Sequence, residues 1–251
     1  MYSLLFIIIF NFSLSDFKEW FYEHKKYGID NNFTKAELNY AFSEKLTYKF
    51  TLEEKYENNK NMELFFEGFQ KINKENELLQ SKFENLNQYH TINKKKYNNT
   101  KIKLLEKNIF KFEIKSKKII FNTKNEYFDP IVTYIFDYFP TFPEKSIDIG
   151  YLWSETYFSE SIVFEKKYNY EFKNFIKFLG YKNGNIVLKN TIFLNVTEKH
   201  FSTKKAKGFG ESIITINNGI VENITVNMDI DWSEEKPYKQ NIQFIKTILN
   251  K

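Results

Sequence analysis

The chain has 251 residues, a net charge of +5 and no cysteine. This length suits one ordinary domain or two small ones with a real hydrophobic core. Without cysteine, thiol catalysis, cysteine-ligated metals, disulfides and a lipidated N-terminal cysteine are excluded. All 37 basic residues are lysine. Because arginine is the residue best suited to bidentate recognition of phosphate and guanine, its absence argues against nucleic acid as a partner.

The N-terminus predicts export. An apolar run, Leu4–Phe10, is followed by the small-x-small pattern Ser13-Leu14-Ser15, and the first charged side chain is Asp16. The run is too short for a transmembrane helix but has the length of a signal-peptide core. We therefore expect residues 1–15 to be cleaved near Ser15 and the protein to be extracytoplasmic, either periplasmic or secreted. The alternative is an uncleaved segment that anchors the protein to a membrane.

Strict alternation of apolar and polar side chains dominates the rest of the chain. It is regular over residues 46–52, 110–114, 168–172 and 224–232. Such a period of two is typical of half-buried antiparallel strands. The protein is therefore expected to be mainly β.

Two Asn-Gly pairs predict tight hairpin turns. Asn183-Gly184 and Asn218-Gly219 each separate two alternating runs. Asn-Gly suits a type I′ turn because both central residues need positive φ. Gly208-Phe209-Gly210 interrupts another run, which indicates a bulge or a close approach of two backbones.

One buried helix is expected over residues 130–139. Asp129 is a suitable N-cap, Pro130 suits the first helical position, and Pro140 would end the helix. Residues 16–27 and 240–250 are expected to form further short helices at the ends. The polar stretch 88–101 is expected to be a loop.

These elements predict antiparallel curved sheets, or a half-barrel in two halves, with one or a few short helices. A boundary is expected around residues 140–145, where two prolines interrupt the pattern. The predicted division is a signal peptide over 1–15, a β-rich half over 16–141 and a second β-rich half over 142–251. The alternative is one continuous curved sheet.

Residues 142–153, with the sequence FPEKSIDIGYLW, resemble the FP-x-K-P-V-x-V-G-D-x-W junction of uncharacterised secreted bacterial β-proteins. The later motifs of that family follow in the same order, with Ser146 and Tyr151 as departures from the junction. The family has no assigned activity to carry over. More remotely, the pattern is similar to lipoprotein-carrier half-barrels of the LolA and LppX type, a resemblance that implies an acyl chain held in a curved sheet.

No motif predicts catalysis, a metal or a cofactor. His24, His90 and His200 are isolated and are interpreted as surface residues. Asp229 and Asp231 share one face of a predicted strand, which is compatible with a carboxylate pair for glycoside hydrolysis or with calcium ligands. The solvated face of a strand explains the same spacing without further assumptions, so we expect no enzyme. A hydrolase with unrecognised acids remains the third hypothesis.

Aromatic residues make up 19% of the chain, and those on the inner face of a curved sheet can line a lipid site. The candidate ligand-binding residues are Trp153, Tyr168, Tyr170 and Phe172, with a packing role at the junction as the alternative for Trp153. The leading hypothesis is an extracytoplasmic, non-enzymatic protein that binds or carries an apolar, lipid-like ligand. The alternative is a structural or surface-interaction protein of the cell envelope, with an envelope protein or peripheral membrane contact as its partner.

Overall fold

The computed structural model describes most of the chain after the predicted signal peptide. Residues 1–15 and His200 lie outside the described residues, as do several short connections. The described ranges are 22–30, 35–41, 45–57, 62–75, 78–93, 95–98, 109–115, 117–121, 130–163, 166–198, 203–233 and 237–250.

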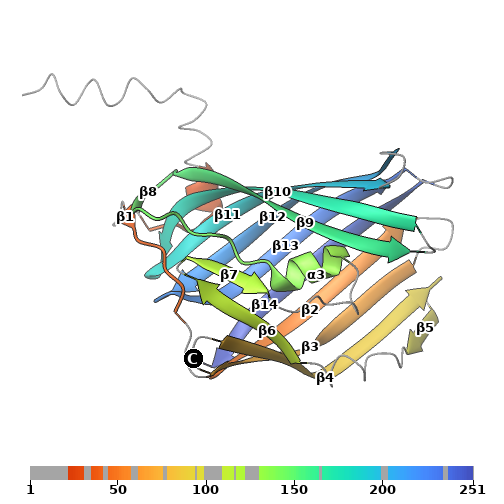
Figure 1. The fold of residues 1–251 in the computed structure, drawn as a ribbon, viewed down its shortest axis with the longest axis horizontal. Coiled ribbons are helices and arrows are strands. Elements are labelled where there is room, and N and C mark those ends of the chain that lie inside the picture. Colours follow the sequence, from red (N-terminus) through yellow and green to blue (C-terminus); the bar gives the residue numbers. More distant parts are fainter. Residues whose placement is uncertain are drawn as a thin grey trace, which may run out of the picture.

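Twelve strands of the described part form one antiparallel sheet (Figure 1). Its order is β7-β6-β4-β3-β2-β14-β13-β12-β11-β10-β9, and β5 pairs with β4. A separate pair joins β1 (Lys35–Ala36) to β8 (Ile147–Asp148). The strands of the large sheet are β2 (Lys45–Glu57), β3 (Met62–Glu75), β4 (Leu78–Ile92), β5 (Lys95–Asn98), β6 (Ile109–Lys115), β7 (Lys118–Phe121), β9 (Leu152–Val163), β10 (Lys166–Lys182), β11 (Asn185–Glu198), β12 (Thr203–Asn217), β13 (Ile220–Trp232) and β14 (Tyr238–Asn250).

The large sheet is curved but not closed, because the described residues of its end strands, β7 and β9, do not pair with each other. The mainly β, half-barrel-like prediction is thereby confirmed. Strand β14 pairs with β2, so strands from before and after residue 141 belong to one continuous sheet. Short hairpin connections join most neighbouring strands, as expected for an antiparallel meander.

The helix α3 (Pro130–Asp137) begins where the sequence predicted and ends two residues earlier. It lies on the concave side of the sheet, between the two ends (Figure 1). Phe136 of this helix is fully buried, and its ring lies 4.7 Å from that of Phe50 on β2 and 4.8 Å from that of Phe244 on β14. The helix therefore fills concave space with aromatic side chains.

Both predicted Asn-Gly turns are confirmed. Asn183 and Gly184 have φ values of 51° and 79°, and Asn218 and Gly219 have 49° and 79°. Near Gly208 and Gly210 the strand pairing is regular, and the neighbouring side chains of β13 approach closely. The bulge interpretation is therefore wrong at these two glycines, where the missing side chain leaves room for the side chains of β13.

Two local predictions were wrong. Residues 240–250 are strand, not helix, because β14 is a central strand paired on both sides by β13 and β2. The expected loop over residues 88–101 is largely strand in its described part. There, β4 continues to Ile92, the chain turns at Asn93 with φ 49°, and β5 pairs back with β4.

Candidate functional site

A groove of about 590 Å³ lies beside β9, the strand at one end of the sheet. Its other wall is the connection between α3 and β8, which contains Pro140 and Pro143. Proline lacks a backbone N–H, so this connection is unsuited to pair as a further strand. We call this hollow the β9 groove; its lining residues are Tyr138, Phe139, Thr141, Phe142, Pro143, Glu144, Lys145, Tyr151, Trp153, Ser154, Glu155, Thr156 and Tyr157.

The side chains of Tyr138, Trp153 and Glu155 form hydrogen bonds that join the two walls. The indole Nε1 of Trp153 donates to the backbone oxygen of Thr141 at 2.9 Å. The Glu155 carboxylate accepts hydrogen bonds from the Tyr138 hydroxyl and, at 3.1 Å, from the Thr141 backbone nitrogen. These bonds hold the connection against β9, and the rings of Tyr151, Trp153 and Tyr157 are among the surfaces that line the hollow.

Tyr138 stays a neutral phenol at any physiological pH. Burial raises its pKa well above the usual value, and the neighbouring Tyr134 and Glu155 carboxylate act in the same direction. A phenolate at this position would be repelled by the carboxylate it now bonds. The groove therefore contains a hydrogen-bonded frame in which a neutral phenol donates to a carboxylate.

The floor of the β9 groove is continuous with the core under α3. The ring of Tyr134 stacks on Tyr138 at 4.9 Å and on Phe172 at 3.9 Å, and it lies 5.6 Å from the ring of Tyr157. Tyr138 and Tyr157 thus belong both to the groove and to this buried aromatic stack. The stack gives the groove a rigid, apolar base.

The four predicted ligand-binding residues occupy different places. Trp153 lines the groove, and Phe172 is completely buried beneath it, against Tyr134 of α3. Tyr170 is buried and Tyr168 half-buried farther along β10, and neither lines the groove.

Tyr138, Phe142 and Tyr157 also line the groove, although they were not among the predicted ligand-binding residues. Trp153 and Tyr157 stand four residues apart on β9, a spacing that places both on one face of a strand. This spacing could have identified Tyr157 from the sequence. The position of the α3–β8 connection beside β9 could not be predicted, because it depends on where the helix packs in the folded protein.

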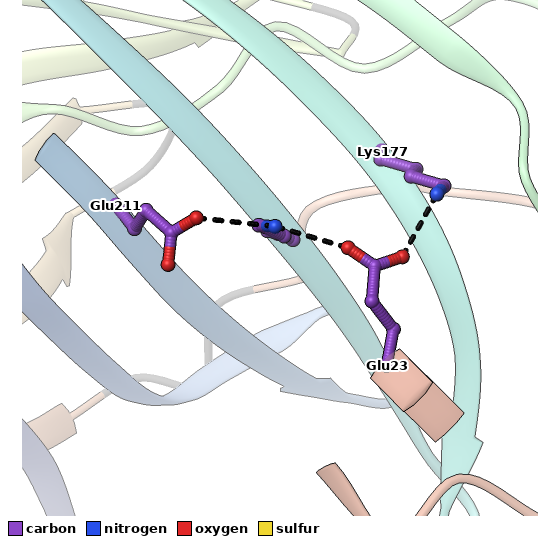
Figure 2. Close-up of polar contacts among 4 residues, drawn as sticks. Glu23, Lys177 and Glu211 are labelled. Carbon is purple, nitrogen blue, oxygen red and sulfur yellow. Dashed lines mark hydrogen bonds and ion pairs between the residues drawn. The ribbon is translucent and has the colours of Figure 1, made fainter. Parts of the chain in front are cut away.

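A second hollow, of about 360 Å³, lies on the convex face of the sheet and is named here the outer groove. Residues 22–27 form a helix on that face, and Glu23 from this helix lines the groove. Its carboxylate lies 2.8 Å from Lys177 Nζ and 3.0 Å from Lys189 Nζ, and Lys189 also contacts Glu211 at 3.1 Å (Figure 2). His24, interpreted as a surface residue, is buried beside Glu23 because the helix packs it against the sheet.

The convex face of β9–β12 carries a group of exposed apolar side chains. Phe193 is central, with its ring 5.8 Å from that of Phe175 and 5.4 Å from that of Phe209. The members are Leu152, Phe175, Phe193 and Phe209, whose exposed fractions are 39–57%. Phe158 is 70% exposed on the same strand β9, but it stands opposite Glu171 and apart from this group. Such a gathering is more than the scattered apolar residues of an ordinary surface.

Asp229 and Asp231 lie exposed on the same convex side of β13. Asp229 accepts a hydrogen bond from the Asn241 side chain at 2.8 Å. The placement matches the solvated strand face that the alternation indicated, away from both grooves.

Neither a protein-family model nor a curated protein sequence matches the chain. A solved structure entitled "Lipid-protein interactions in lipovitellin" is similar, with a TM-score of 0.46 and 10% sequence identity. The match covers 82% of this chain and 25% of that one, so the chain spans about a quarter of its length. Within the described residues, no helix has the length and apolar character needed to cross a membrane.

Proposed function

We propose that the protein is a non-enzymatic binding protein that holds an apolar, lipid-like ligand in the β9 groove. The observation that supports this most is the wall chemistry. Tyr151, Trp153 and Tyr157 line the hollow with aromatic rings, and the indole of Trp153 and the carboxylate of Glu155 are already bonded to the opposite wall. An apolar ligand can enter such a site without leaving buried polar groups unpaired.

An acyl chain fits the proposed chemistry. Each methylene transferred from water to an apolar site gains about 0.8 kcal/mol. About ten methylenes would contribute about 8 kcal/mol, as much as micromolar binding requires in total, so a longer acyl chain or headgroup contacts must offset the cost of association. Lys145 lies exposed at the rim, where it can meet an anionic headgroup in water, and the adjacent Glu144 weakens that attraction.

The proposal places this function outside the cytoplasm. The apolar run and small-x-small pattern of residues 1–15 support it, together with the resemblance of residues 142–153 to secreted bacterial β-proteins. N-terminal sequencing of protein from its own host should find a start at or near Asp16. An intact Met1 in a cytosolic fraction would contradict this location.

The ligand proposal is tested with a fluorescent fatty-acid probe. Tyr151 is 46% exposed and lines the groove, so Tyr151→Ala removes contact surface with little cost to the core. We expect micromolar binding by the unaltered protein and an affinity at least about fivefold lower for this variant. Phe209→Ala is the matched control, because Phe209 is 50% exposed on the convex face and outside the groove.

Equal affinities of the Tyr151 and Phe209 variants would move the binding site away from the β9 groove. No binding of the probe at micromolar concentration, and no lipid co-purifying in native mass spectrometry, would end the lipid proposal. A competing natural lipid extracted from the host would identify the ligand class.

The second candidate function is that of a surface-interaction protein of the cell envelope. The exposed apolar group on the convex face of β9–β12 favours it. The double variant Phe193→Ser, Phe209→Ser should then abolish co-sedimentation with the host envelope fraction. Tyr151→Ala should leave that co-sedimentation intact, which separates this candidate from the lipid proposal.

A further inference from the structure

The exposed apolar group on the convex face belongs to a row of side chains that crosses four strands. Lys173 on β10 stands directly opposite Phe193 on β11. Phe193 in turn stands opposite Phe209 on β12, which stands opposite Asp229 on β13. Directly opposite residues of antiparallel strands point to the same face, and all four are exposed. The row therefore has a cation at one end, two aromatic rings in the middle and an anion at the other end.

The two central rings present apolar surface that the described part of the chain leaves open to solvent. Phe193 is 41% exposed and Phe209 is 50% exposed, and their ring centroids lie 5.4 Å apart. Phe175 and Leu152, which are 39% and 57% exposed, extend this surface toward β9. Burial of such a surface is favourable, and a group of this kind marks an interaction site.

The order of the charges makes the row complementary to itself. A two-fold axis that passes between β11 and β12, perpendicular to the sheet, exchanges β11 with β12 and β10 with β13. In a second copy related by this axis, Asp229 faces Lys173 at both ends of the row, and the central rings face each other. A row with the same charge at both ends would instead repel its own copy.

The dimensions of the sheet permit these contacts. Neighbouring strands lie about 4.8 Å apart, so Lys173 and Asp229 are each about 7 Å from the axis. Sheets packed face to face are rotated by about 30°, which displaces the ends of the row by about 4 Å, within the reach of a lysine side chain. Lys173 now lies 3.4 Å from Glu171, and the two side chains are 50% and 31% exposed. An ion pair this exposed contributes little, so Lys173 can exchange it for Asp229 of the second copy.

The neighbouring rows are compatible with this arrangement. The same axis brings Glu211 opposite Asn195 of the second copy, and Asn227 opposite Glu171. Each acid thereby meets an amide side chain that can donate a hydrogen bond to it. An anionic lipid surface is a poorer match for this face, because it would repel the exposed Asp229.

We propose that a second copy of this chain covers the convex face, in a two-fold dimer centred on Phe193 and Phe209. The inference goes beyond ligand binding in the β9 groove and is independent of it, since none of the four row residues lines that groove. The sheet is convex here, so the contact is confined to the central strands. The dimer is therefore a reversible one, with dissociation in the micromolar range.

Reversal of the charges at the ends of the row tests this geometry. Sedimentation equilibrium of the unaltered protein should show monomer and dimer exchanging between about 2 and 500 µM. Lys173→Glu and Asp229→Lys should each weaken dimerisation at least about tenfold, because each places like charges face to face twice. Lys49→Glu is the matched control, because Lys49 is exposed on the convex side of β2 and outside the row. Tyr151→Ala should also leave dimerisation unchanged, which separates this proposal from the lipid proposal.

A mixture of the two charge variants gives the sharper result. In a mixed dimer the introduced glutamate faces the introduced lysine, and the native Asp229 of one chain faces the native Lys173 of the other. Equal amounts of Lys173→Glu and Asp229→Lys should therefore dimerise nearly as well as the unaltered protein, although each alone does not. Dimers that use another face, or another register of this face, do not show this rescue.

Each outcome decides the matter once circular dichroism and the urea midpoint show the variants folded. A monomer at all concentrations overturns the proposal, and its co-sedimentation with vesicles of phosphatidylglycerol and phosphatidylethanolamine would assign the face to a membrane surface instead. Weakening without rescue in the mixture also overturns it, as does equal weakening by Lys49→Glu. Should a charge variant fail to fold, Phe209→Ser takes its place: dimerisation at least about tenfold weaker is expected, and an unchanged dissociation constant overturns the proposal.

Discussion

Two glycines with the same backbone conformation have different surroundings. Gly184 and Gly219 both have φ 79°, in the left-handed region required by their hairpin turns. A Cβ at Gly184 would meet no atom within 4 Å, whereas one at Gly219 would lie 2.7 Å from Ala41 N and from Asn39 O. The turn at Gly219 is also tied to the passing chain by a 2.8 Å hydrogen bond from Ala41 N to Gly219 O.

This difference predicts unequal effects of the same substitution. Gly184→Ala carries only the cost of a left-handed non-glycine residue, about 1 kcal/mol. Gly219→Ala adds a collision with backbone atoms that cannot move freely, so we expect a total loss of about 3 kcal/mol. Urea unfolding at neutral pH measures both. Equal losses at the two sites would show that the contact with residues 39–41 has no energetic weight.

The alternation of apolar and polar residues predicted which apolar side chains are buried in the strands. It did not predict the polar side chains that are buried among them. Leu46, Tyr48, Phe50 and Leu52 are all 0–1% exposed, as their spacing indicated. Asn174 and Asn190 occupy fully buried positions of the same inner face, where the hydroxyl of Tyr134 donates to Asn174 Oδ1 and the amide of Asn190 donates to the same oxygen at 3.0 Å. Polar pairing of this kind depends on a helix distant in sequence, so no local pattern indicates it.

The helix over residues 22–27 is held on the sheet by ion pairs. At this place the sheet by itself carries an unfavourable pair of like charges. Lys177 and Lys189 stand directly opposite each other on β10 and β11, and like charges in such a pair repel. The Glu23 carboxylate lies between them. Burial by itself raises the pKa of Glu23, but hydrogen bonds from the two lysines outweigh this, and the pKa lies below its usual value.

The sign of this shift fixes the pH dependence. A carboxyl with a lowered folded pKa stabilises the protein above its ordinary pKa of 4.5, and the effect is lost as pH falls through the folded value. The pKa of Lys189 is raised: desolvation lowers it, but bonds to Glu23 and Glu211 outweigh that effect. The contribution of Lys189 is therefore present below 10.5 and lost only at more alkaline pH.

Glu23→Gln should therefore lower the free energy of unfolding at pH 7 by about 2 kcal/mol, since it removes charged hydrogen bonds in a buried place. Its deficit relative to the unaltered protein should shrink as pH falls toward 3, because the unaltered carboxyl is then protonated too. Glu171→Gln is the control, because the side chains of its ion pair with Lys173 are 31% and 50% exposed, and a loss below about 0.5 kcal/mol is expected. Urea titrations at several pH values that find a constant deficit would refute this account.

Helices and strands were predicted correctly where capping residues and prolines agreed with the hydrophobic pattern. The prediction was wrong where the same residues fitted both a helical and a strand period. Pro130 and Pro140 bracket α3, and the helix was found there. In residues 240–250, Ile242, Ile245 and Leu249 suit a helix face, whereas Ile242, Phe244 and Ile248 suit a strand face. Pairing with β13 and β2 decides in favour of the strand, and this pairing is a tertiary effect.

The large sheet contains strands from both sides of the boundary that Pro140 and Pro143 predicted at residues 140–145. Strand β14, at the end of the chain, pairs with β2 from Lys239↔Glu57 to Asn250↔Thr47. The β9 groove has the same origin: its walls come from a strand and from a connection that meet only when α3 is seated on the concave face. Sequence patterns identified the strand type and Trp153. They did not identify the groove, because its second wall has no periodic signal.

This architecture predicts that the two sequence halves unfold together. Phe136 of α3 touches Phe50, Phe66 and Phe83 on β2–β4 and also Phe244 on β14, so one aromatic cluster joins the halves. Separating them would expose that cluster and break the β2–β14 ladder, which is more costly than unfolding both at once. Pulsed hydrogen exchange at increasing urea should show amides of β3 and β11 losing protection at the same concentration. Two distinct midpoints would instead reveal two independent domains, with residues 140–145 as their linker.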